Sequence, residues 1–439
     1  MTNPVWDFVR GYAASEVLRA HMPGHKGRAL LGCEPYDLTE VAGADTLDAP
    51  SGILAESERN AAALFGSARS CLCTEGSSQC VRAMVYLALL SRAAGTPPRL
   101  LAARNVHKSF VYACALCGAE VDWLWPERRS SLCGCGVPPA ALEAALARLD
   151  APPAAVYVTS PDYLGALAEV GGLAEVCRAR ALPLLVDNAH GAYLRFLPRS
   201  LHPLDAGAAL CCDSAHKTLP VLTGGAWLHV GRDAPAAFAE GAKRALDLFC
   251  STSPSYLTLA SLDRCQADLA GGYPRRLAET AEALAALRLE LRRQGWTVAD
   301  SDPLRLTLSG DGAEAAARLR RAGIEPEYAG RDGCVLMLTP ENPPETPQRI
   351  ARALGNPPEG AARPPELPLA VCPRACTLRE AVFSPQVRVP VREAAGRICG
   401  APAVSCPPAV PVAVSGERLT AEAVELMEYY GIRAVSVLA

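Results

Sequence analysis

The chain has 439 residues, of which half are apolar and one fifth are charged, and its formal net charge is -3. A chain of this length can bury more than one core, and the small net charge gives no basic surface for nucleic acid. The sequence contains no apolar run of the roughly 18 residues that a membrane helix needs, and its N-terminus lacks the layout of a signal peptide. These features predict a cytoplasmic protein that acts on small molecules and binds neither nucleic acid nor membranes.

The 18 cysteines are scattered along the chain. Without an export signal, we interpret them as reduced thiols that fill the core and not as a disulfide framework. Close pairs with C-x-C or C-x-x-C spacing occur at three places: Cys71/Cys73, Cys133/Cys135 and Cys114/Cys117. No further His or Cys cluster completes a tetrahedral site beside them, so we predict no bound metal.

Short apolar runs alternate with helical segments over residues 70–230, which is typical of a mostly parallel sheet with helices on both faces. Seven strands are predicted from these runs, at residues 70–74, 99–104, 120–125, 154–160, 183–188, 208–213 and 226–230. In an open sheet of this kind, ligands bind outside the carboxyl ends of the strands. The residues directly after each run are therefore the candidates for a functional site.

Beyond these strands, a helix is predicted over residues 275–295, where apolar residues recur at helical spacing and Gly295 provides a stop. A smaller α/β unit follows, in which strands at 304–310 and 334–340 flank a helix at 313–323. The proline-rich stretch "GNPPEGAARPPELP" then marks a joint. This order predicts five parts: an N-terminal arm (1–30), a large cofactor-binding domain (31–274), a small α/β domain (275–356), a linker (357–368) and a C-terminal domain (369–439).

Ionisable side chains gather at the predicted strand ends. The stretches in question are "TEGSSQ", "RNVHKS", "TSPDYLG", "VDNAHGAY" and "DSAHKT". A purely structural sheet more often ends in plain turn residues such as Gly, Asn and Pro. The gathering of Asp, His, Lys and Ser at one edge therefore indicates a site.

Lys217 is the predicted centre of that site. A lysine amine can form a Schiff base with an aldehyde, and this bond anchors the cofactor pyridoxal phosphate. Asp187 would lie under the pyridine nitrogen and keep it protonated, so that the ring can accept electrons. His190 could support Asp187 or the hydroxyl of the ring, and His107 could stack on the opposite face. Taken singly, such a lysine is usually solvated and such an aspartate usually caps a turn or helix.

The turn "EGSS" at residues 75–78 is predicted to bind the phosphate of the cofactor. It joins a strand to a helix through small residues, so that Gly76 and the helix N-terminus can present backbone N–H groups to a dianion. The hydroxyls of Ser77 and Ser78 can point the same way. Ser214 and His216, beside the lysine, could complete the phosphate site.

These residues resemble the Orn/Lys/Arg decarboxylase family of fold-type-I pyridoxal phosphate enzymes. Seven stretches carry the resemblance in the order of the family: "HMPGHKG", "TEGSSQC", "RNVHKS", "TSPDYLG", "VDNAHGAY", "DSAHKTLPVLTGGAWLHV" and "LFCSTSPSYLTLASLD". Residues 378–420 resemble the family's C-terminal domain, so the likeness covers nearly the whole chain. It implies an α/β fold with a seven-stranded, mostly parallel sheet, a smaller α/β domain and a small C-terminal domain, in a short form without an N-terminal wing domain.

The resemblance also implies roles for individual residues. Lys217 would be the Schiff-base lysine, Asp187 the pyridinium partner and His107 the base that stacks on the ring. The phosphate contacts would be Ser77, Ser78, Ser214 and His216. Family members are dimers or larger oligomers with the active site at the subunit boundary. Ser253, in the stretch "STSPSY" (251–256), would then reach the partner's cofactor phosphate, and the "PGHKG" arm would cover the partner's site; the alternative for "STSPSY" is a helix-entry turn.

The sequence departs from the family pattern at three places. Asp162 and Leu164 in "SPDYLG" stand where the family often shows "SPTYYG". Residues 44–56 lack a histidine that many members carry, and "PPAVP" replaces "PPGIP" in the C-terminal domain. These departures bear on the identity of the substrate.

The predicted function is α-decarboxylation of arginine, lysine or ornithine, which gives CO₂ and an amine of polyamine biosynthesis. The substrate amine would displace Lys217, and His216 or Lys217 would protonate the α-carbon. The distal cation of the substrate needs an acidic partner, for which Glu417, Glu325 and Glu327 are candidates; alternatively Glu417 caps a helix and the other two lie on a solvated strand. Another enzyme with the same cofactor, such as an aminotransferase, aldolase or β-eliminase, stays open, as does an inactive cofactor-binding paralogue.

Overall fold

The computed structural model describes residues 1–126, 134–357, 369–404 and 410–439. The chain divides into two compact units, each assembled from separate stretches. The first unit comprises Met1–Leu100, Leu149–Val158 and Val170–Pro274, and the second comprises Leu101–Arg148, Thr159–Glu169 and Arg275–Ala439. The five predicted domain boundaries stay predictions, and nearly all of the predicted linker lies outside the described residues.

All seven predicted strands are present, close to the predicted ranges. They are β1 (Arg69–Cys73), β2 (Arg99–Ala103), β3 (Glu120–Leu124), β4 (Ala155–Thr159), β5 (Leu184–Asp187), β6 (Leu210–Asp213) and β7 (Ala226–Val230), in the order β1-β7-β6-β5-β4-β2-β3. β5 and β6 pair in parallel, whereas β7 pairs antiparallel with both β6 and β1. Every residue of β5, β6 and β7 is buried, as expected for strands covered on both faces. The predicted fold class, α/β with a seven-stranded mostly parallel sheet, is confirmed.

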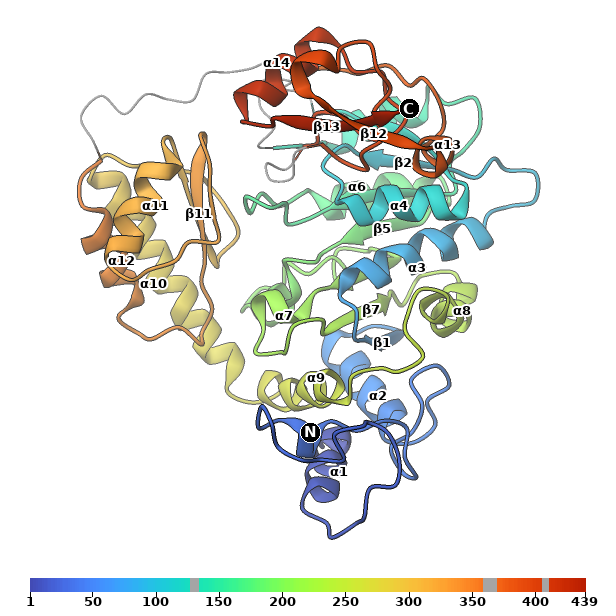
Figure 1. The fold of residues 1–439 in the computed structure, drawn as a ribbon, viewed down its shortest axis with the longest axis vertical. Coiled ribbons are helices and arrows are strands. Elements are labelled where there is room, and N and C mark those ends of the chain that lie inside the picture. Colours follow the sequence, from blue (N-terminus) through green and yellow to red (C-terminus); the bar gives the residue numbers. More distant parts are fainter. Residues whose placement is uncertain (127–133, 358–368, 405–409) are drawn as a thin grey trace. The chain divides into compact units, whose positions relative to one another are not determined.

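The helices of the first unit connect its strands, and the N-terminal helix packs against two of the others. They are α1 (Pro4–Ala13), α2 (Ile53–Phe65), α3 (Ser77–Leu90), α6 (Val170–Ala179), α7 (Ala215–Thr218), α8 (Ala236–Asp247) and α9 (Tyr256–Leu269). The N-terminal helix α1 packs against α9, as the dark blue and yellow ribbons of Figure 1 show. The buried carboxylate of Asp263 on α9 accepts hydrogen bonds from the amides of Val5 and Trp6, both at 3.0 Å. Asp263 thereby satisfies the first N–H groups of α1.

The second unit contains two smaller antiparallel sheets. The four-stranded sheet has the order β10-β11-β9-β8, with β8 (Thr297–Val298), β9 (Arg305–Ser309), β10 (Tyr328–Ala329) and β11 (Gly333–Met337). The two-stranded sheet pairs β12 (Gln386–Pro390) with β13 (Ala434–Leu438). The helices are α4 (Lys108–Cys117), α5 (Pro139–Leu146), α11 (Gly312–Arg321), α12 (Thr346–Leu354), α13 (Leu378–Phe383) and α14 (Ala421–Tyr429), and α10 (Tyr273–Arg293) connects the units along the chain. The helix predicted at 275–295 is α10, which ends before Gly295 at a φ of +100°.

The C-terminal segment of the second unit has a core of its own. Its fully buried apolar side chains include Ala394, Val410, Ala413, Met427 and Val437. Trp125, which directly follows β3, packs against this cluster. The C-terminal segment is therefore joined to the β2-α4-β3 region through apolar contacts as well as through the polar contacts described below.

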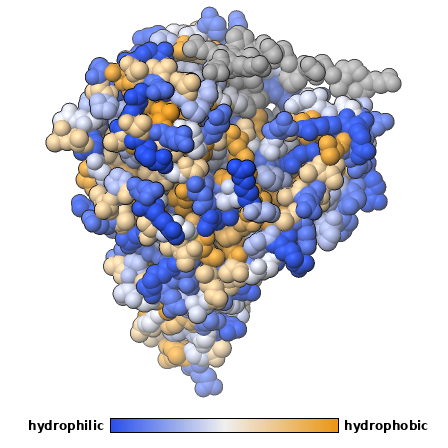
Figure 2. Space-filling model, turned by 180° about the vertical axis from the view of Figure 1, so that it is seen from behind, coloured by the Kyte–Doolittle hydropathy of each residue, from blue (hydrophilic) through white to orange (hydrophobic). Residues whose placement is uncertain are grey.

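No described helix is long and apolar enough to cross a membrane. On the face drawn in Figure 2, hydrophilic residues in blue are interspersed with hydrophobic residues in orange.

The described cysteines are all free thiols, and most of them are buried. Burial raises the pKa of Cys71 to about 12, as expected for a thiol that fills a core. Cys133 of the predicted Cys133/Cys135 pair lies outside the described residues.

Candidate active site

The polar strand ends of the first unit meet at one edge of the sheet. β5 and β6 are parallel, and β1 has the same direction as β6 because both pair antiparallel with β7. The residues that follow these three strands therefore share an edge. They are the "DNAH" stretch after β5, the "SAHK" stretch after β6 and the "EGSS" turn after β1.

Lys217 is exposed on the short helix α7, and its amine lies 2.9 Å from Nε2 of His190. A hydrogen bond between two nitrogens needs one of them as an acceptor, so one of the pair donates a proton to the lone pair of the other. The structure thus brings together two of the residues predicted from separate motifs. His190 contacts the lysine, whereas the sequence had suggested that it supports Asp187 or the cofactor's hydroxyl.

Asp187 ends β5 and is only 2% exposed. Its Oδ2 accepts a hydrogen bond from the Tyr157 hydroxyl at 3.0 Å, and its Oδ1 accepts from the Ala189 amide at 3.2 Å and from the Cys212 thiol at 3.5 Å. Each of these donors is neutral. They fix the carboxylate in the interior without cancelling its charge, so it suits a cationic N–H group such as a protonated pyridine nitrogen.

The helix α3 begins at Ser77 and presents its first N–H groups at the same edge. The hydroxyl of Ser214 donates to that of Ser77 at 2.8 Å, which joins the turn before α3 to the turn after β6. Gly76 has a φ of +71°, and a Cβ there would lie 3.8 Å from the His216 ring. Ser78 is half-buried in the first turn of α3. The start of a helix with two hydroxyls and a glycine before it is a suitable site for a phosphate.

His216 carries a proton on Nδ1. Its Nδ1 lies 3.0 Å from the carbonyl oxygen of Gly225, and since a carbonyl only accepts, Nδ1 carries the proton. Burial, together with the positive charge of Lys217, lowers the pKa of His216. These residues fit pyridoxal phosphate, because a reactive amine, a buried carboxylate and a phosphate cradle lie along one edge of the sheet.

The chain matches the family model described as "Orn/Lys/Arg decarboxylase, major domain" over residues 4–307, and the model of that family's C-terminal domain over residues 366–435. The chain belongs to the Orn/Lys/Arg decarboxylase family. The resemblance inferred from the seven motifs is thereby confirmed, and the members of this family are amino acid decarboxylases.

Individual relatives agree with the family match. The chain is 29% identical to the uncharacterized protein YaaO of Bacillus subtilis (strain 168), over 97% of this chain and 93% of that protein. It is 28% identical to the arginine decarboxylase of the same organism, over 96% of this chain and 92% of that enzyme. Its fold is similar to that of the lysine decarboxylase LdcF of Francisella novicida, with a TM-score of 0.81 and 18% identity over 100% of this chain and 81% of LdcF.

Behind the lysine of this decarboxylase lies a polar network that sequence reasoning missed. Asp213, the last residue of β6, is fully buried and accepts from Nδ2 of Asn188 at 2.7 Å and from Nε2 of His202 at 3.0 Å. Nε2 of His229 lies 3.3 Å from the same carboxylate. Burial alone would raise the pKa of Asp213, but the charge and hydrogen bond of His202, with the contribution of His229, hold it well below its ordinary value.

The Asp213 network fixes the ends of β5 and β6 relative to each other, because Asn188 directly follows Asp187 and Asp213 precedes the lysine segment. His202, Cys211 and Asp213 form the one group among the described residues whose donor atoms, all within 4.8 Å, could hold a metal ion. The histidine and the aspartate contact each other as just described, and the Cys211 thiol donates to Oδ1 of Asp213 at 3.7 Å. The two histidines stand alone in the sequence, so no local motif could have connected them to Asp213.

His107 and Ser253 are two further residues that were predicted to contact the cofactor. His107 is the N-cap of α4 in the second unit, where its Nδ1 accepts from the Ser109 amide at 3.2 Å. In the first unit, the Ser251 amide donates to the Glu75 side chain at 2.6 Å, and Ser255 caps α9. The segment "STSPSY" is thus a helix-entry turn beside the phosphate turn. The predicted roles of His107 at the cofactor and of Ser253 at a partner's phosphate stay predictions.

The acidic residues predicted to bind the substrate all have partners within the second unit. Glu417 is 4% exposed and forms a bidentate ion pair with Arg104. It does not cap the helix that follows, whose N-cap is Thr420. The exposed Glu325 pairs with Arg320 at 2.6 Å, and Glu327 accepts a hydrogen bond from a tyrosine hydroxyl at 3.0 Å. A substrate cation would have to compete with these partners, so the substrate role of Glu417 has no support from the geometry and stays a prediction.

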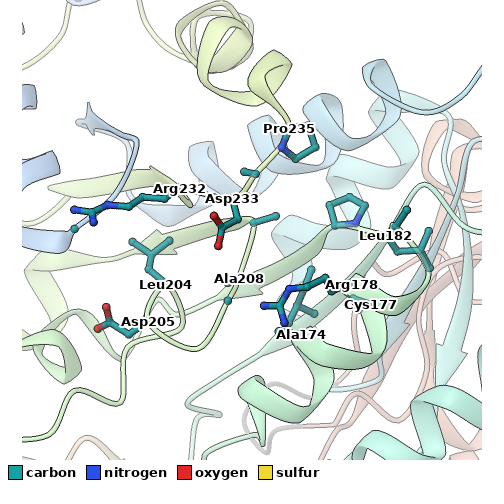
Figure 3. A pocket seen from close by; sticks show the side chains of 17 residues that line it. Ala174, Cys177, Arg178, Leu182, Leu204, Asp205, Ala208, Arg232, Asp233 and Pro235 are labelled. Atoms are coloured by element: carbon teal, nitrogen blue, oxygen red, sulfur yellow. The ribbon is translucent and has the colours of Figure 1, made fainter.

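A cavity of about 470 Å³ in the first unit lies at the opposite edge of the sheet. Its lining includes the residues that precede β5 and β6 and those that follow the antiparallel strand β7. Figure 3 shows the side chains of Arg178, Asp205, Arg232 and Asp233 around it. This cavity is therefore separate from the predicted decarboxylase site, which lies at the carboxyl ends of the parallel strands.

Proposed function

We propose that the chain catalyses the pyridoxal phosphate-dependent α-decarboxylation of a basic amino acid, with arginine as the first candidate and lysine and ornithine next. The observation that carries this proposal is the cluster of Lys217, His190, Asp187, Ser77 and Ser214 at the edge of the sheet in a member of a decarboxylase family. The 28% identity to an arginine decarboxylase supports the choice of arginine. The product amine would enter polyamine biosynthesis.

In this proposal Lys217 anchors the cofactor and the α3 N-terminus with Ser77, Ser78 and Ser214 binds its phosphate. Bound there, pyridoxal phosphate would supply an electron sink for the electron pair released when carbon dioxide leaves the substrate. Asp187 holds the proton on the ring nitrogen on which that sink depends. Its burial and its three neutral donors keep the carboxylate directed at one place.

We assign two proton transfers to His190 and Lys217. An ammonium is not a nucleophile, so Lys217 has to lose a proton before its amine can bond to a carbonyl, and His190 at 2.9 Å is placed to accept it. The sequence left His216 and Lys217 as alternative proton donors to the substrate's α-carbon. We propose Lys217, because Nδ1 of His216 is engaged with the Gly225 carbonyl, and burial together with the charge of Lys217 lowers the pKa of His216 and so disfavours a second proton on Nε2.

We further propose a homodimer or larger oligomer of the cytoplasm whose subunits share active sites. Exposed apolar side chains between residues 18 and 31 support this proposal, since Leu18 and Leu31 are each 89% exposed and Leu30 is 70% exposed. Apolar side chains exposed to this extent on one segment are typical of a surface that a second chain covers. The acidic partner for the substrate's distal cation could then come from the neighbouring subunit.

The proposal is tested by a product screen. Purified protein with added pyridoxal phosphate is incubated with arginine, lysine, ornithine and the other common amino acids, and the products are identified by mass spectrometry beside those of Lys217→Ala. Agmatine, cadaverine or putrescine formed only by the wild type supports the proposal and names the substrate. A keto acid without amine would instead indicate an aminotransferase, and retained cofactor absorbance without any product would indicate an inactive paralogue.

A further inference from the structure

Arg104 and Glu417 form a buried ion pair that joins two segments 313 residues apart in the chain. The two terminal nitrogens of the guanidinium donate to the two carboxylate oxygens at 2.7 and 2.8 Å. Arg104 is fully buried and Glu417 is 4% exposed. A bidentate pair of this kind defines both the distance and the orientation of its two segments.

The surroundings of the pair restrict it further. The guanidinium carbon lies 4.8 Å from the ring centre of Trp123 and 4.7 Å from that of Trp125, so two indole rings stack on Arg104. Glu417 also accepts a hydrogen bond from the Val414 amide at 2.9 Å. A planar guanidinium suits such a stacked, bidentate site, and a lysine would not replace it.

Arg104 lies directly after β2 and three residues before His107. Its own amide donates to the Leu124 carbonyl at 3.0 Å, so its backbone is fixed to β3 and its side chain to the C-terminal segment. The short chain "NV" is all that separates this fixed point from His107, the N-cap of α4. Movement of Arg104 would therefore move the start of α4.

The far end of α4 is held by the same C-terminal segment. Arg379 on α13 donates to the carbonyls of Ala115 and Leu116, at 3.2 and 3.1 Å, in the last turn of α4. Figure 1 shows α13, in red, beside α4, in blue-green, and the two helices pack against each other. Both ends of α4, whose N-cap is His107, are thus attached to residues beyond position 369.

We infer that Arg104 and Glu417 are positioning residues through which the C-terminal domain holds α4 and so sets the place of His107. This inference rests on the proposed function and on the predicted role of His107 as the base that stacks on the cofactor ring. It gives the C-terminal domain a part in catalysis that requires no contact between that domain and the substrate. It also explains why Glu417 is buried against Arg104 and is not available to a substrate cation.

The chain contains a matched control. Arg374 and Glu120 form a second ion pair between the same two regions, but their side chains are 61% and 34% exposed. Exposed ion pairs contribute little to stability. Arg374→Gln should therefore leave both the dynamics of α4 and the activity near wild type, whereas Glu417→Gln should change both.

The first experiment measures backbone hydrogen exchange by mass spectrometry on the full chain with pyridoxal phosphate. Glu417→Gln should raise exchange in peptides that cover Arg104 to Cys117 and leave those of α9 at the wild-type level. If Glu417→Gln does not fold, Arg379→Ala, which removes only an exposed side chain, should raise exchange in the last turn of α4. Unchanged exchange over α4 in the folded variants would overturn the inference, and this readout does not depend on any activity.

The second experiment tests whether the pair acts through His107. We expect Glu417→Gln to lower kcat about tenfold with a smaller change in KM, because a small displacement of a catalytic group is costly. In a His107→Ala background the same substitution should have no further effect. An equal loss in both backgrounds would mean that Glu417 acts elsewhere. The product screen judges the proposed function separately, because it uses only the wild type and Lys217→Ala.

Discussion

Substitution of Asp187 gives the clearest test of the candidate site, because the proposed chemistry depends on the charge of this side chain. Asp187→Asn keeps the shape of the side chain but removes the charge that holds a proton on the ring nitrogen. We expect kcat to fall on the order of 100-fold, the size of effect seen when one preorganised electrostatic group is removed. Steady-state kinetics with saturating cofactor measure it.

Tyr157→Phe is the matched control for Asp187→Asn. It removes the 3.0 Å hydrogen bond to Oδ2 but leaves the carboxylate charged and buried. The expected loss in kcat is less than tenfold. If the two variants lose the same activity, orientation and not charge is what Asp187 supplies.

The raised pKa of Asp162 makes the stability of the fold depend on pH. Burial raises the pKa of Asp162 from 3.8 to about 6, although the amides of Leu164 and Ala166 donate to its carboxylate. The folded protein therefore holds a proton that the unfolded chain releases between pH 3.8 and about 6. The contribution of Asp162 to stability is fully present below this window and is lost as the pH rises through it, by about 3 kcal/mol at most.

Asp162→Asn removes this contribution while the side-chain oxygen still accepts the two amide hydrogen bonds. We expect the variant to become more stable relative to wild type as the pH rises from 4 to 7, which urea unfolding at several pH values measures. Asp263, whose pKa burial also raises to about 6, changes stability in the same direction and is left intact. A constant difference between variant and wild type across this range would contradict the prediction.

The sequence could reveal Lys217, Asp187 and Ser77 because each stands in a short motif next to an apolar strand. It could not reveal that Glu417 pairs with Arg104, since 313 residues separate them and neither stands in a pattern that names the other. A lone buried glutamate and a glutamate at a substrate site look alike in sequence. The same holds for His202 and His229, which meet Asp213 only when the sheet forms.

The turn before α3 and the loop after α7 are held together by glycine backbone. The Gly76 amide donates to the Gly224 carbonyl at 2.7 Å, and Gly224 has a φ of +96°. A Cβ at Gly224 would lie 2.5 Å from the carbonyl oxygen of Thr74, a backbone atom that cannot move aside easily. The phosphate turn and the lysine loop can approach this closely only because the residue is glycine.

Gly224→Ala should therefore destabilise the fold by about 2 kcal/mol or more and weaken the binding of pyridoxal phosphate. Gly118→Ala is the control: Gly118 ends α4 with a φ of +69° but has open space around its Cβ position. It should cost about 1 kcal/mol and leave cofactor binding unchanged. Denaturant unfolding and cofactor titration distinguish the two; equal effects would mean that the left-handed conformation, and not the contact with Thr74, is what matters.

The elements that the sequence predicted well are those with a strong repeating pattern. The seven strands of the main sheet are apolar runs because both faces are covered, and α10 is a long amphipathic helix. The two-residue strands β8 and β10 were not predicted, because two residues show no period. The short helix α13, which contacts α4, is marked only by its capping box of Thr377 and Glu380.

At the level of the complete chain, the proposed oligomer has one main consequence: each active site needs residues from two subunits. Lys217 would bind the cofactor of its own subunit, whereas Ser253 would contact the phosphate of the partner. Both residues are exposed. A variant at Lys217 should therefore inactivate the site that binds its own subunit's cofactor, and a variant at Ser253 should inactivate the site of the partner.

This arrangement predicts complementation between two inactive variants. Lys217→Ala removes the anchor, and Ser253→Asp places a negative charge where the partner's phosphate would bind. When the two proteins are unfolded, mixed and refolded together, random pairing makes half of the dimers mixed, and each mixed dimer has one intact site, so activity should return to roughly a quarter of wild type. Ser255→Ala, which removes only the α9 cap, serves as the control. It should keep most of its activity without a partner. Two inactive variants that stay inactive after mixing, although size-exclusion chromatography shows dimers, would place Ser253 in the same site as Lys217 and reject the shared site.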